Sequence, residues 1–221
     1  MSIIELENIY FRYAEDEPWV LKNFSLKLEA GSCTVITGDN GSGKSTLFRI
    51  LNGLSFPERG TYRFDGSEIT EKALNDNSAS KLFHKRIGFL FQNPDVMLFN
   101  ARVYDEVAFG PRQMGLSDVE VQTRTDDCLK LFDIGLLSDK APYHLSGGQK
   151  KKVAFAAVMA LNPEVLVLDE PFEGLDAKSR EWLLPFLKDL KTAGKTLIMA
   201  THNSSLVAEI TDCTVDMNSY I

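Results

Sequence analysis

The pattern of hydrophobic and polar residues changes twice along the chain. Residues 6–11 and 24–28 alternate apolar and polar side chains, which is typical of strands that bury one face. A turn-forming segment, residues 15–18, lies between them, and residues 61–66 extend the β-rich pattern. This part of the chain therefore predicts an antiparallel β subdomain.

Later apolar segments are short and continuous instead of alternating. They span residues 33–37, 87–91, 165–168 and 197–200. Because a strand covered on both faces has no polar face, such runs predict a parallel sheet wrapped by helices. Each run is followed by polar residues, and ligands of open α/β sheets sit beyond the carboxyl ends of the strands. We therefore expect four pieces of chain to deliver polar groups to one rim.

Residues 93–159 show helical spacing and contain no buried-strand pattern. Within them, residues 119–132 place apolar side chains among charged ones, as an amphipathic helix does. The apolar positions of that helix are Val121, Cys128, Leu129, Leu131 and Phe132. We expect a helical subdomain inserted within a single α/β domain that spans residues 1–221. Pro185 lies in the helical pattern of residues 177–190, which predicts a kink or a helix break there.

Composition and charge restrict the classes of function. The 221 residues are 44% hydrophobic and 25% charged, which is ordinary for a globular protein. A net charge of -7 argues against a nucleic-acid-binding protein, which needs a basic surface. Cys33, Cys128 and Cys213 lack the spacing of metal ligands. We therefore expect all three cysteines to be small buried hydrophobic side chains. Neither a signal-peptide pattern nor an apolar run of about 18 residues occurs, so we expect a soluble protein of a reducing compartment.

Residues 38–45 carry the strongest chemical signal. Their sequence, GDNGSGKS, matches the phosphate-binding loop G-x-x-x-x-G-K-[ST] and lies between an apolar run and a helical pattern. Its glycines let backbone N–H groups converge on a triphosphate, Lys44 adds a positive charge, and Ser45 offers a hydroxyl to Mg²⁺. The helix that follows directs its positive end at the same anion. A glycine-rich surface loop does not explain this strand and helix context. The predicted nucleotide contacts are Gly38, Asp39, Asn40, Gly41, Ser42, Gly43, Lys44, Ser45 and Thr46.

Two adjacent acids end the apolar run at residues 165–168. Asp169 is suited to hold Mg²⁺ through a water molecule, beside Ser45. Glu170 then points past the γ-phosphate and is suited to act as a general base that polarises an attacking water. The alternative, a strand that ends in solvated acids, is weaker in a chain that already carries a phosphate loop.

Residues 145–149, with the sequence LSGGQ, form the motif that best discriminates among nucleotide-binding proteins. Ser146 is a good N-cap, and Gly147 and Gly148 leave the first N–H groups of a helix uncovered for an anion. The lysines at 150–152 oppose the helix dipole by about 0.3–1 kcal/mol each, so we expect an anion or an acidic surface beside them. The alternative is an ordinary capped helix.

In this order, these motifs resemble those of the ATP-binding cassette (ABC) ATPases, over residues 3 to about 217. The resemblance implies the P-loop NTPase fold of ABC ATPases and hydrolysis of ATP with Mg²⁺. It also implies a head-to-tail dimer with a second ABC ATPase subunit, homomeric or heteromeric. In that dimer, Ser146, Gly147, Gly148 and Gln149 contact the γ-phosphate held by the other copy.

The resemblance also implies roles for three single residues. Tyr13 resembles the aromatic residue that stacks on adenine, although from the sequence alone it is equally a packed turn residue. Gln92 resembles the residue that links the γ-phosphate and the metal to a transmembrane partner. His202 resembles the histidine that hydrogen-bonds the γ-phosphate, and a neutral histidine at a strand end is the alternative. The implied catalytic residues are Glu170, His202 and Gln92, and the implied metal ligands are Ser45, Gln92 and Asp169.

A narrower match is with the energy-coupling-factor group of importers, which take up vitamins or cobalt and nickel ions. It rests on the segments FQNPD at 91–95, LF at 98–99, DEVAFGP at 105–111, YH at 143–144 and QKK at 149–151. The match implies a transmembrane coupling subunit and a substrate-binding membrane protein as partners, and a place on the cytoplasmic face of the cell membrane. Residues 95–111 would line the groove that receives the coupling helices.

Some features depart from the family pattern. Met97 stands where a polar residue is frequent, and Lys152 where arginine is commoner. Phe172 and Glu173 replace a threonine and a small residue, close to the cross-dimer contact expected at Asp176. The chain stops soon after its last apolar run, so we expect dimer contacts from a C-terminal extension to be absent or replaced.

Two other functions are alternatives to the importer. A soluble ABC switch for DNA repair or iron–sulfur cluster assembly fits the nucleotide motifs, but repair members usually carry coiled-coil or zinc insertions. A small-molecule kinase with a phosphate loop explains residues 38–45. It leaves residues 145–149 and His202 without a function.

Overall fold

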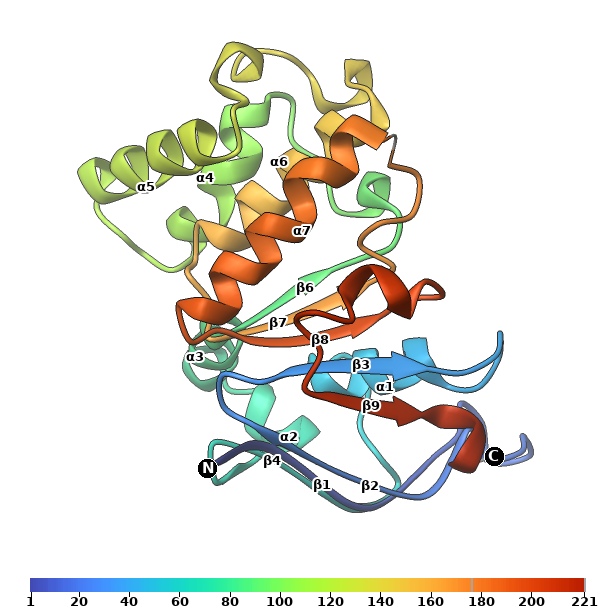
Figure 1. Cartoon of the computed structure of the whole chain (residues 1–221). Helices are drawn as coiled ribbons and strands as arrows, with labels where there is room; N and C mark the ends of the chain where they lie inside the picture. Colours follow the sequence, from blue (N-terminus) through green and yellow to red (C-terminus); the bar gives the residue numbers. More distant parts are fainter. Residues whose placement is uncertain (176, 221) are drawn as a thin grey trace.

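Two β-sheets form the framework of the computed structural model, which describes residues 1–175 and 177–220 (Figure 1). The smaller sheet is antiparallel and has the order β2-β1-β4-β5. Its strands are β1 (Ser2–Phe11), β2 (Leu21–Glu29), β4 (Arg59–Phe64) and β5 (Ser67–Glu68). Along β2, buried residues alternate with exposed ones, because only one face of this sheet meets the core. The predicted antiparallel region is confirmed.

The larger sheet is parallel and has the order β6-β7-β8-β3-β9. Its strands are β3 (Cys33–Thr37), β6 (Ile87–Leu90), β7 (Val165–Asp169), β8 (Thr196–Ala200) and β9 (Cys213–Asp216). Successive residues of one strand enter different cores. Cys33 and Val35 pack with the helices on one face, whereas Ile36 packs toward the antiparallel sheet. The continuous apolar runs are therefore strands buried on both faces, as predicted.

Helices fill the space on both sides of the parallel sheet (Figure 1). Helix α1 (Lys44–Leu51) shares a core with both sheets, and α6 (Gly147–Met159) and α7 (Ala177–Thr192) cover the opposite face. Helices α4 (Val103–Gln113) and α5 (Asp118–Leu131) lie farther from the sheet. The remaining short helices are α2 (Glu71–Leu74), α3 (Asn77–Arg86), η1 (Pro94–Val96), η2 (Gly135–Leu137), η3 (Pro142–His144), η4 (Ser204–Val207) and η5 (Met217–Tyr220).

Residues 93–159 contain helices and loops but no strand, as their spacing predicts. Their treatment as a separate inserted subdomain stays a prediction, because side chains of α4, α5 and α6 share one core with the parallel sheet. In α5, four of the five predicted apolar positions are buried, but Leu131 is 60% exposed. The buried face instead includes Thr125, whose hydroxyl donates to the carbonyl oxygen of Val121 at 2.7 Å.

Two other expectations were not met in full, at Pro185 and at Cys213. Helix α7 continues through Pro185 without a break, since buried Leu183 and Leu187 hold the helix to the core on either side, and a kink there stays a prediction. Cys33 and Cys128 are buried and burial raises the pKa of each to about 11, but Cys213 is exposed on β9. Within the described ranges, no helix has the length and apolarity needed to cross a lipid bilayer.

Candidate functional site

The loop between β3 and α1 adopts a conformation that requires glycine at two positions. Gly38 and Gly43 have φ angles of 140° and 90°. A Cβ on Gly38 would lie 2.5 Å from Ser42 Oγ, and a Cβ on Gly43 would lie 3.2 Å from the carbonyl oxygen of Val20. Either side chain would strain the backbone; the one on Gly38 would also clash within the loop, and the one on Gly43 would press against Val20 and the start of β2. Gly43 is the N-cap of α1, so the first N–H groups of that helix open toward the loop.

Polar contacts hold this loop in place. Asp39 N donates to Asn218 Oδ1 at 3.1 Å, which ties the loop to the end of the chain. Lys44 folds over the loop, and its Nζ donates to the carbonyl oxygens of Gly38 at 2.6 Å and Asp39 at 2.9 Å. The hydroxyl of Tyr13 lies 2.9 Å from Thr46 Oγ1, and the Tyr13 ring is 56% exposed. An exposed ring held over the loop is free to stack on a base.

Most of the predicted nucleotide residues line one cavity of about 330 Å³. Its lining is Tyr13, Val20, Asn40, Gly41, Gly43, Lys44, Ser45, Thr46, Gln92, Asp169, Glu170 and His202. Gly38, Asp39 and Ser42 belong to the loop but do not line the cavity. The polar residues that follow β3, β6, β7 and β8 thus meet at one rim of the parallel sheet, as expected for an open α/β sheet.

Glu170 is held in an unusual backbone conformation at this rim. Its φ is 43°, and its N–H donates to the carbonyl oxygen of Ala200 at 3.0 Å. Glu170 Oε2 accepts from the N–H of His202 at 3.3 Å. Glu170 Oε1 is buried 3.5 Å from His202 Nε2 but forms no hydrogen bond within the described part of the chain. One carboxylate oxygen is therefore available to a water or a substrate group.

Burial changes the proton affinity of both acids at the end of β7, Asp169 in the strand and Glu170 directly after it. It raises the pKa of Glu170, and the backbone N–H and the ring of His202 oppose the increase. It also raises the pKa of Asp169, while Lys44 and Lys151 favour its charged form. A carboxylate with a raised pKa accepts a proton more readily near neutral pH than an ordinary one. The site therefore contains a candidate base, Glu170, beside a candidate ligand, Asp169.

The donor set of the cavity fits Mg²⁺. The Ser45 hydroxyl, the Gln92 amide and the Asp169 carboxylate all belong to residues that line the same cavity. No group of three or more His, Cys, Asp or Glu side chains is placed to hold a metal among the described residues. Mg²⁺ keeps several water ligands and takes phosphate oxygens, so a few protein oxygens suffice.

The three lysines at the start of α6 have different surroundings. Lys150 Nζ lies 2.7 Å from Asp95 Oδ1, so the expected acidic neighbour is present. Lys151 is 1% exposed, and its Nζ donates to the carbonyl oxygen of Gln92 at 2.8 Å. Burial lowers the pKa of Lys151 to about 8, against the opposing effect of Glu173, Asp169 and Glu170. Lys152 instead lies over the Trp182 ring, 5.6 Å from its centroid.

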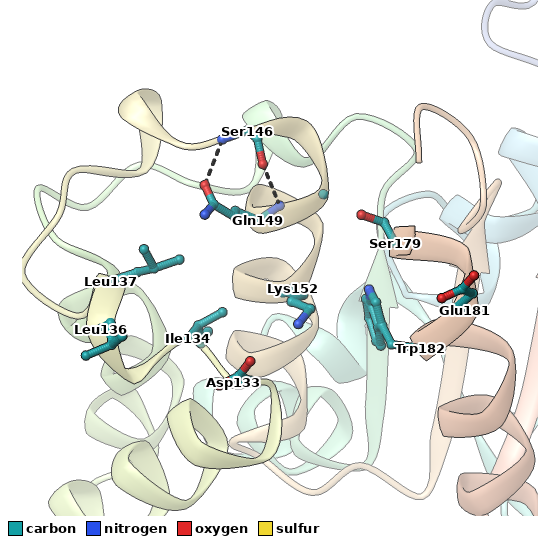
Figure 2. A pocket seen from close by; sticks show the side chains of 11 residues that line it. Asp133, Ile134, Leu136, Leu137, Ser146, Gln149, Lys152, Ser179, Glu181 and Trp182 are labelled. Atoms are coloured by element: carbon teal, nitrogen blue, oxygen red, sulfur yellow. Dashed lines mark hydrogen bonds between the residues drawn. The ribbon is translucent and has the colours of Figure 1, made fainter. Parts of the chain in front are cut away.

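Residues 146–149 form the predicted helix start but lie outside the nucleotide cavity. The N–H of Ser146 donates to Gln149 Oε1 at 3.0 Å, and the N–H of Gln149 donates to Ser146 Oγ at 3.4 Å. Ser146, Gly148 and Gln149 line a second cavity of about 690 Å³ between α6, α7 and η2 (Figure 2). Gly147 lines a third cavity of about 260 Å³. Asp176 lies outside the described residues.

Two residues with clear structural roles were not predicted. Glu106 is buried on α4, and its Oε2 accepts from Phe99 N at 3.0 Å, Asn100 N at 2.7 Å and Asn100 Nδ2 at 3.1 Å. It therefore shapes the loop before α4. An acid between Val103 and Val107 on an apolar helix face was the available signal. Asn218, which supports the phosphate loop, gave no such signal.

A parallel sheet with a phosphate loop before α1 and adjacent acids after β7 defines a P-loop nucleotide-binding ATPase domain. A family model described as ABC transporter matches residues 21–173. The chain belongs to the ABC transporter family, as the ATP-binding domain.

Curated relatives match nearly the full chain. The nickel import ATP-binding protein LarO of Lactiplantibacillus plantarum is 48% identical over 217 residues, which cover 98% of this chain and 89% of that protein. The energy-coupling factor transporter ATP-binding protein EcfA of Methanosphaera stadtmanae is 41% identical over 211 residues, covering 96% of this chain and 74% of that protein.

Solved structures agree with this assignment. The structure of cbiO1 from Clostridium perfringens, part of the ABC transporter complex cbiONQ, has a TM-score of 0.84 and 36% identity, covering 97% of this chain and 84% of that chain. A dimeric ATP-binding cassette in a post-hydrolysis state with ADP and Pi has a TM-score of 0.81 and 29% identity, covering 92% of this chain and 90% of that chain. The predicted ABC ATPase fold is confirmed.

Proposed function

We propose that this chain is the ATP-hydrolysing subunit of an energy-coupling-factor-type importer that takes up a transition-metal ion or a vitamin. One observation carries the proposal. The phosphate loop, Gln92, Asp169, Glu170 and His202 line one cavity, while residues 146–149 lie on another part of the same chain. The first set binds and activates a nucleotide, and the second set is available to a nucleotide held by another copy.

Within one copy, each cavity residue has a distinct task. The loop N–H groups and Lys44 bind the phosphates, and the exposed Tyr13 ring stacks on the base. Mg²⁺, when bound, neutralises charge on the β- and γ-phosphate oxygens. Ser45, Gln92 and Asp169 are the residues that would hold it.

Glu170 and His202 act at the γ-phosphate. Glu170 accepts a proton from water as the water oxygen bonds to the γ-phosphorus and the bond to the β–γ bridging oxygen breaks. The products are ADP and phosphate. His202, beside Glu170 and largely exposed, donates a hydrogen bond to the γ-phosphate. Most of the rate enhancement comes from positioning and charge stabilisation.

The second subunit completes the reaction centre. In a head-to-tail dimer, the N–H groups at the start of α6 meet the γ-phosphate held by the facing copy. The dimeric relative with ADP and Pi supports this arrangement. The partner is a second copy of this chain or a related ATP-binding subunit.

An apolar groove beside β6 fits the coupling helix of a transmembrane subunit. The groove has a volume of about 200 Å³ and includes Phe89, Met97, Leu98, Phe109 and Leu161 in its lining. Phe99, in the loop shaped by Glu106, is 67% exposed nearby. The relation to cbiO1, part of a transporter complex, and to a nickel import protein supports membrane partners and a metal-ion or vitamin cargo. The protein then lies peripherally on the cytoplasmic face of the membrane, with a substrate-binding membrane protein in the same complex.

Glu170→Gln tests the proposed chemistry. The variant loses the base but keeps the phosphate loop, so it should bind ATP normally, lose most hydrolysis and accumulate as an ATP-bound dimer in size-exclusion chromatography. Glu68→Gln, at an exposed site on β5, is the matched control with the same change in charge. Unchanged phosphate release by Glu170→Gln would remove Glu170 from its role.

Purification of the native protein tests the importer. Gentle extraction in detergent should recover it with polytopic membrane subunits, identified by mass spectrometry. Recovery with soluble proteins alone would favour an ABC switch over a transporter subunit.

A further inference from the structure

Gln92 borders two cavities at once. It lines the nucleotide cavity and also the third cavity, where the segment after β6, the start of α6 and the turn after β7 meet. The lining of that third cavity is Gln92, Asn93, Pro94, Gly147, Lys151, Glu173 and Gly174. Gln92 is thus placed to respond to both the nucleotide and the helix that begins at residue 147.

Two contacts hold Gln92 from the side of the third cavity. Gln92 Nε2 donates a hydrogen bond to Glu173 Oε2. Lys151 Nζ donates to the backbone carbonyl oxygen of Gln92 at 2.8 Å. Lys151 and Glu173 thus both bind Gln92. One contact fixes the backbone at residue 92 and the other fixes its side chain.

The chemistry of the pair determines which way the Gln92 amide faces. A carboxylate has acceptors only, so the NH₂ group of Gln92, and not its oxygen, must face Glu173. The amide oxygen of Gln92 then lies on the side of the amide group that faces away from Glu173. That oxygen is the only atom of the side chain suited to a hard cation. A small residue at position 173 would have no acceptor to select this orientation.

The turn that carries Glu173 is anchored in the core. Phe172 and Leu175 are both buried there. The N–H of Glu173 donates to the carbonyl oxygen of Glu170 at 3.1 Å, and the N–H of Leu175 donates to that of Phe172 at 3.4 Å. The two residues that depart from the family pattern therefore work together, because Phe172 fixes the turn and Glu173 extends from it to Gln92.

We propose that Glu173 is a positioning residue that fixes the Gln92 side chain with its amide oxygen directed away from the turn and toward the metal and γ-phosphate. The inference rests on the proposed role of Gln92 in binding these groups. It links the turn after β7, which leads to Asp176, with the residue that senses the nucleotide. Glu173 does not touch the reacting atoms, so its effect must pass through Gln92.

A double-mutant cycle tests this dependence. Glu173→Ala should lower kcat for ATP hydrolysis roughly three- to tenfold, because an exposed charged hydrogen bond is lost. In the non-hydrolysing Glu170→Gln background, the affinity for Mn²⁺ with ATP, measured by electron paramagnetic resonance, should fall by a similar factor. Adding Glu173→Ala to Gln92→Ala should cause no further loss in either measurement.

Conservative variants distinguish the loss of the Glu173–Gln92 hydrogen bond from a general loss of stability. Glu173→Gln retains an acceptor oxygen at the same length and should recover most activity, whereas Glu173→Met has the same length without an acceptor and should behave like Glu173→Ala. Glu68→Ala is the control for loss of an exposed carboxylate. Urea unfolding of each variant should give midpoints close to that of the parent.

The outcomes distinguish this inference from the function on which it rests. If Gln92→Ala is defective but Glu173→Ala and Glu173→Met match the parent, the positioning role is wrong. The role is equally wrong if Glu173→Ala causes the same loss with and without Gln92. If Gln92→Ala itself keeps normal turnover and Mn²⁺ affinity, the proposed role of Gln92 fails and the inference fails with it.

Discussion

The nucleotide cavity and the second cavity, at the start of α6, differ in the chemistry they gather. The nucleotide cavity brings together Lys44, Asp169, Glu170 and His202 from separate pieces of chain. The second cavity presents the capped start of a helix, and its lysine, Lys152, lies over the Trp182 ring (Figure 2). The first can bind an anion, hold a cation and accept a proton. The second offers the N–H groups of a helix start to an anion, and two carboxylates, Asp133 and Glu181, also line it.

This difference separates binding from turnover in one chain. A change in the nucleotide cavity should weaken ATP binding by a single copy. A change at the start of α6 should leave that binding intact and reduce hydrolysis, because in the proposed dimer this segment would complete the site of the facing copy. Substitutions in each region should therefore have effects of different kind and size.

Lys44→Ala should cause the largest loss, in binding itself. Removing the ammonium from the phosphate loop should lower ATP affinity roughly a hundredfold, near the upper range for charged hydrogen bonds. Isothermal titration calorimetry with the purified chain measures this directly. Lys22→Ala, at an exposed position of β2, is the control and should bind as the parent does. Parent-like affinity in Lys44→Ala would refute the assignment of the first cavity.

Gly148→Ala should reduce hydrolysis without reducing binding by one copy. A Cβ there would lie 2.3 Å from Ser179 Oγ and 3.2 Å from Ser179 Cβ, so the contact between the start of α6 and α7 must change. Turnover should fall about tenfold or more, as when one aligned donor is lost. ATP affinity, measured under non-hydrolysing conditions, should remain unchanged.

Gly135→Ala provides the control for this glycine substitution. A Cβ on Gly135 meets nothing within 4 Å, so both binding and turnover should stay at parent levels. If Gly148→Ala hydrolyses ATP like the parent, the start of α6 does not complete the reaction centre. If it loses ATP affinity as Lys44→Ala does, the two cavities are not separate in function.

The sequence was sufficient for the parts of the site that depend on local spacing. The phosphate loop and the acids at 169–170 follow apolar runs, and period and length alone identified these runs as buried strands. The N-cap at Ser146 was predictable because capping needs one side chain and its own backbone. The meeting of four strand ends at one rim followed from the rule for parallel sheets.

Features that depend on distant contacts were not predictable in this way. The bonds from Gln92 to Glu173 and from Asp39 to Asn218 join residues far apart in sequence, and no spacing rule connects them. Strand β9 was missed because half of its four residues are polar. A break at Pro185 does not occur, because tertiary packing can keep a helix continuous where a backbone bond is lost.

Lys151→Met should affect the contact between the start of α6 and Gln92 more than the fold. The variant loses the bond to the Gln92 carbonyl but also removes a charge that is costly to bury. The free energy of unfolding should therefore change by about 1 kcal/mol or less, while kcat falls roughly threefold. Urea titration and phosphate release measure the two effects.

Lys188→Met is the control for this change of side chain. Lys188 is exposed and lies 3.4 Å from Glu209 Oε2 on the surface, so its loss should alter neither quantity appreciably. A large loss of stability in Lys151→Met with normal kcat would show that Lys151 is structural alone.

Asp212→Asn should have the smallest effect, on stability and not on either cavity. Asp212 Oδ1 lies 2.7 Å from Lys191 Nζ, and Oδ2 accepts from Cys33 N at 2.8 Å, at the edge where β9 joins the sheet. These bonds lower the pKa of Asp212, with Lys191 the larger cause. A lowered pKa stabilises the fold above the ordinary carboxylate range, and this contribution is lost as pH falls below it.

The variant should therefore lose about 1 kcal/mol at neutral pH, and the difference from the parent should shrink below about pH 4. Urea unfolding across this range measures it, with Asp189→Asn on the exposed face of α7 as the control for charge. ATP affinity and turnover should match the parent, because Asp212 lies at the amino ends of β3 and β9, opposite the rim that lines the nucleotide cavity. A loss of hydrolysis in this variant would mean that a change at the edge of the sheet alters the reaction centre. The proposed division of tasks between the two cavities would then be incomplete.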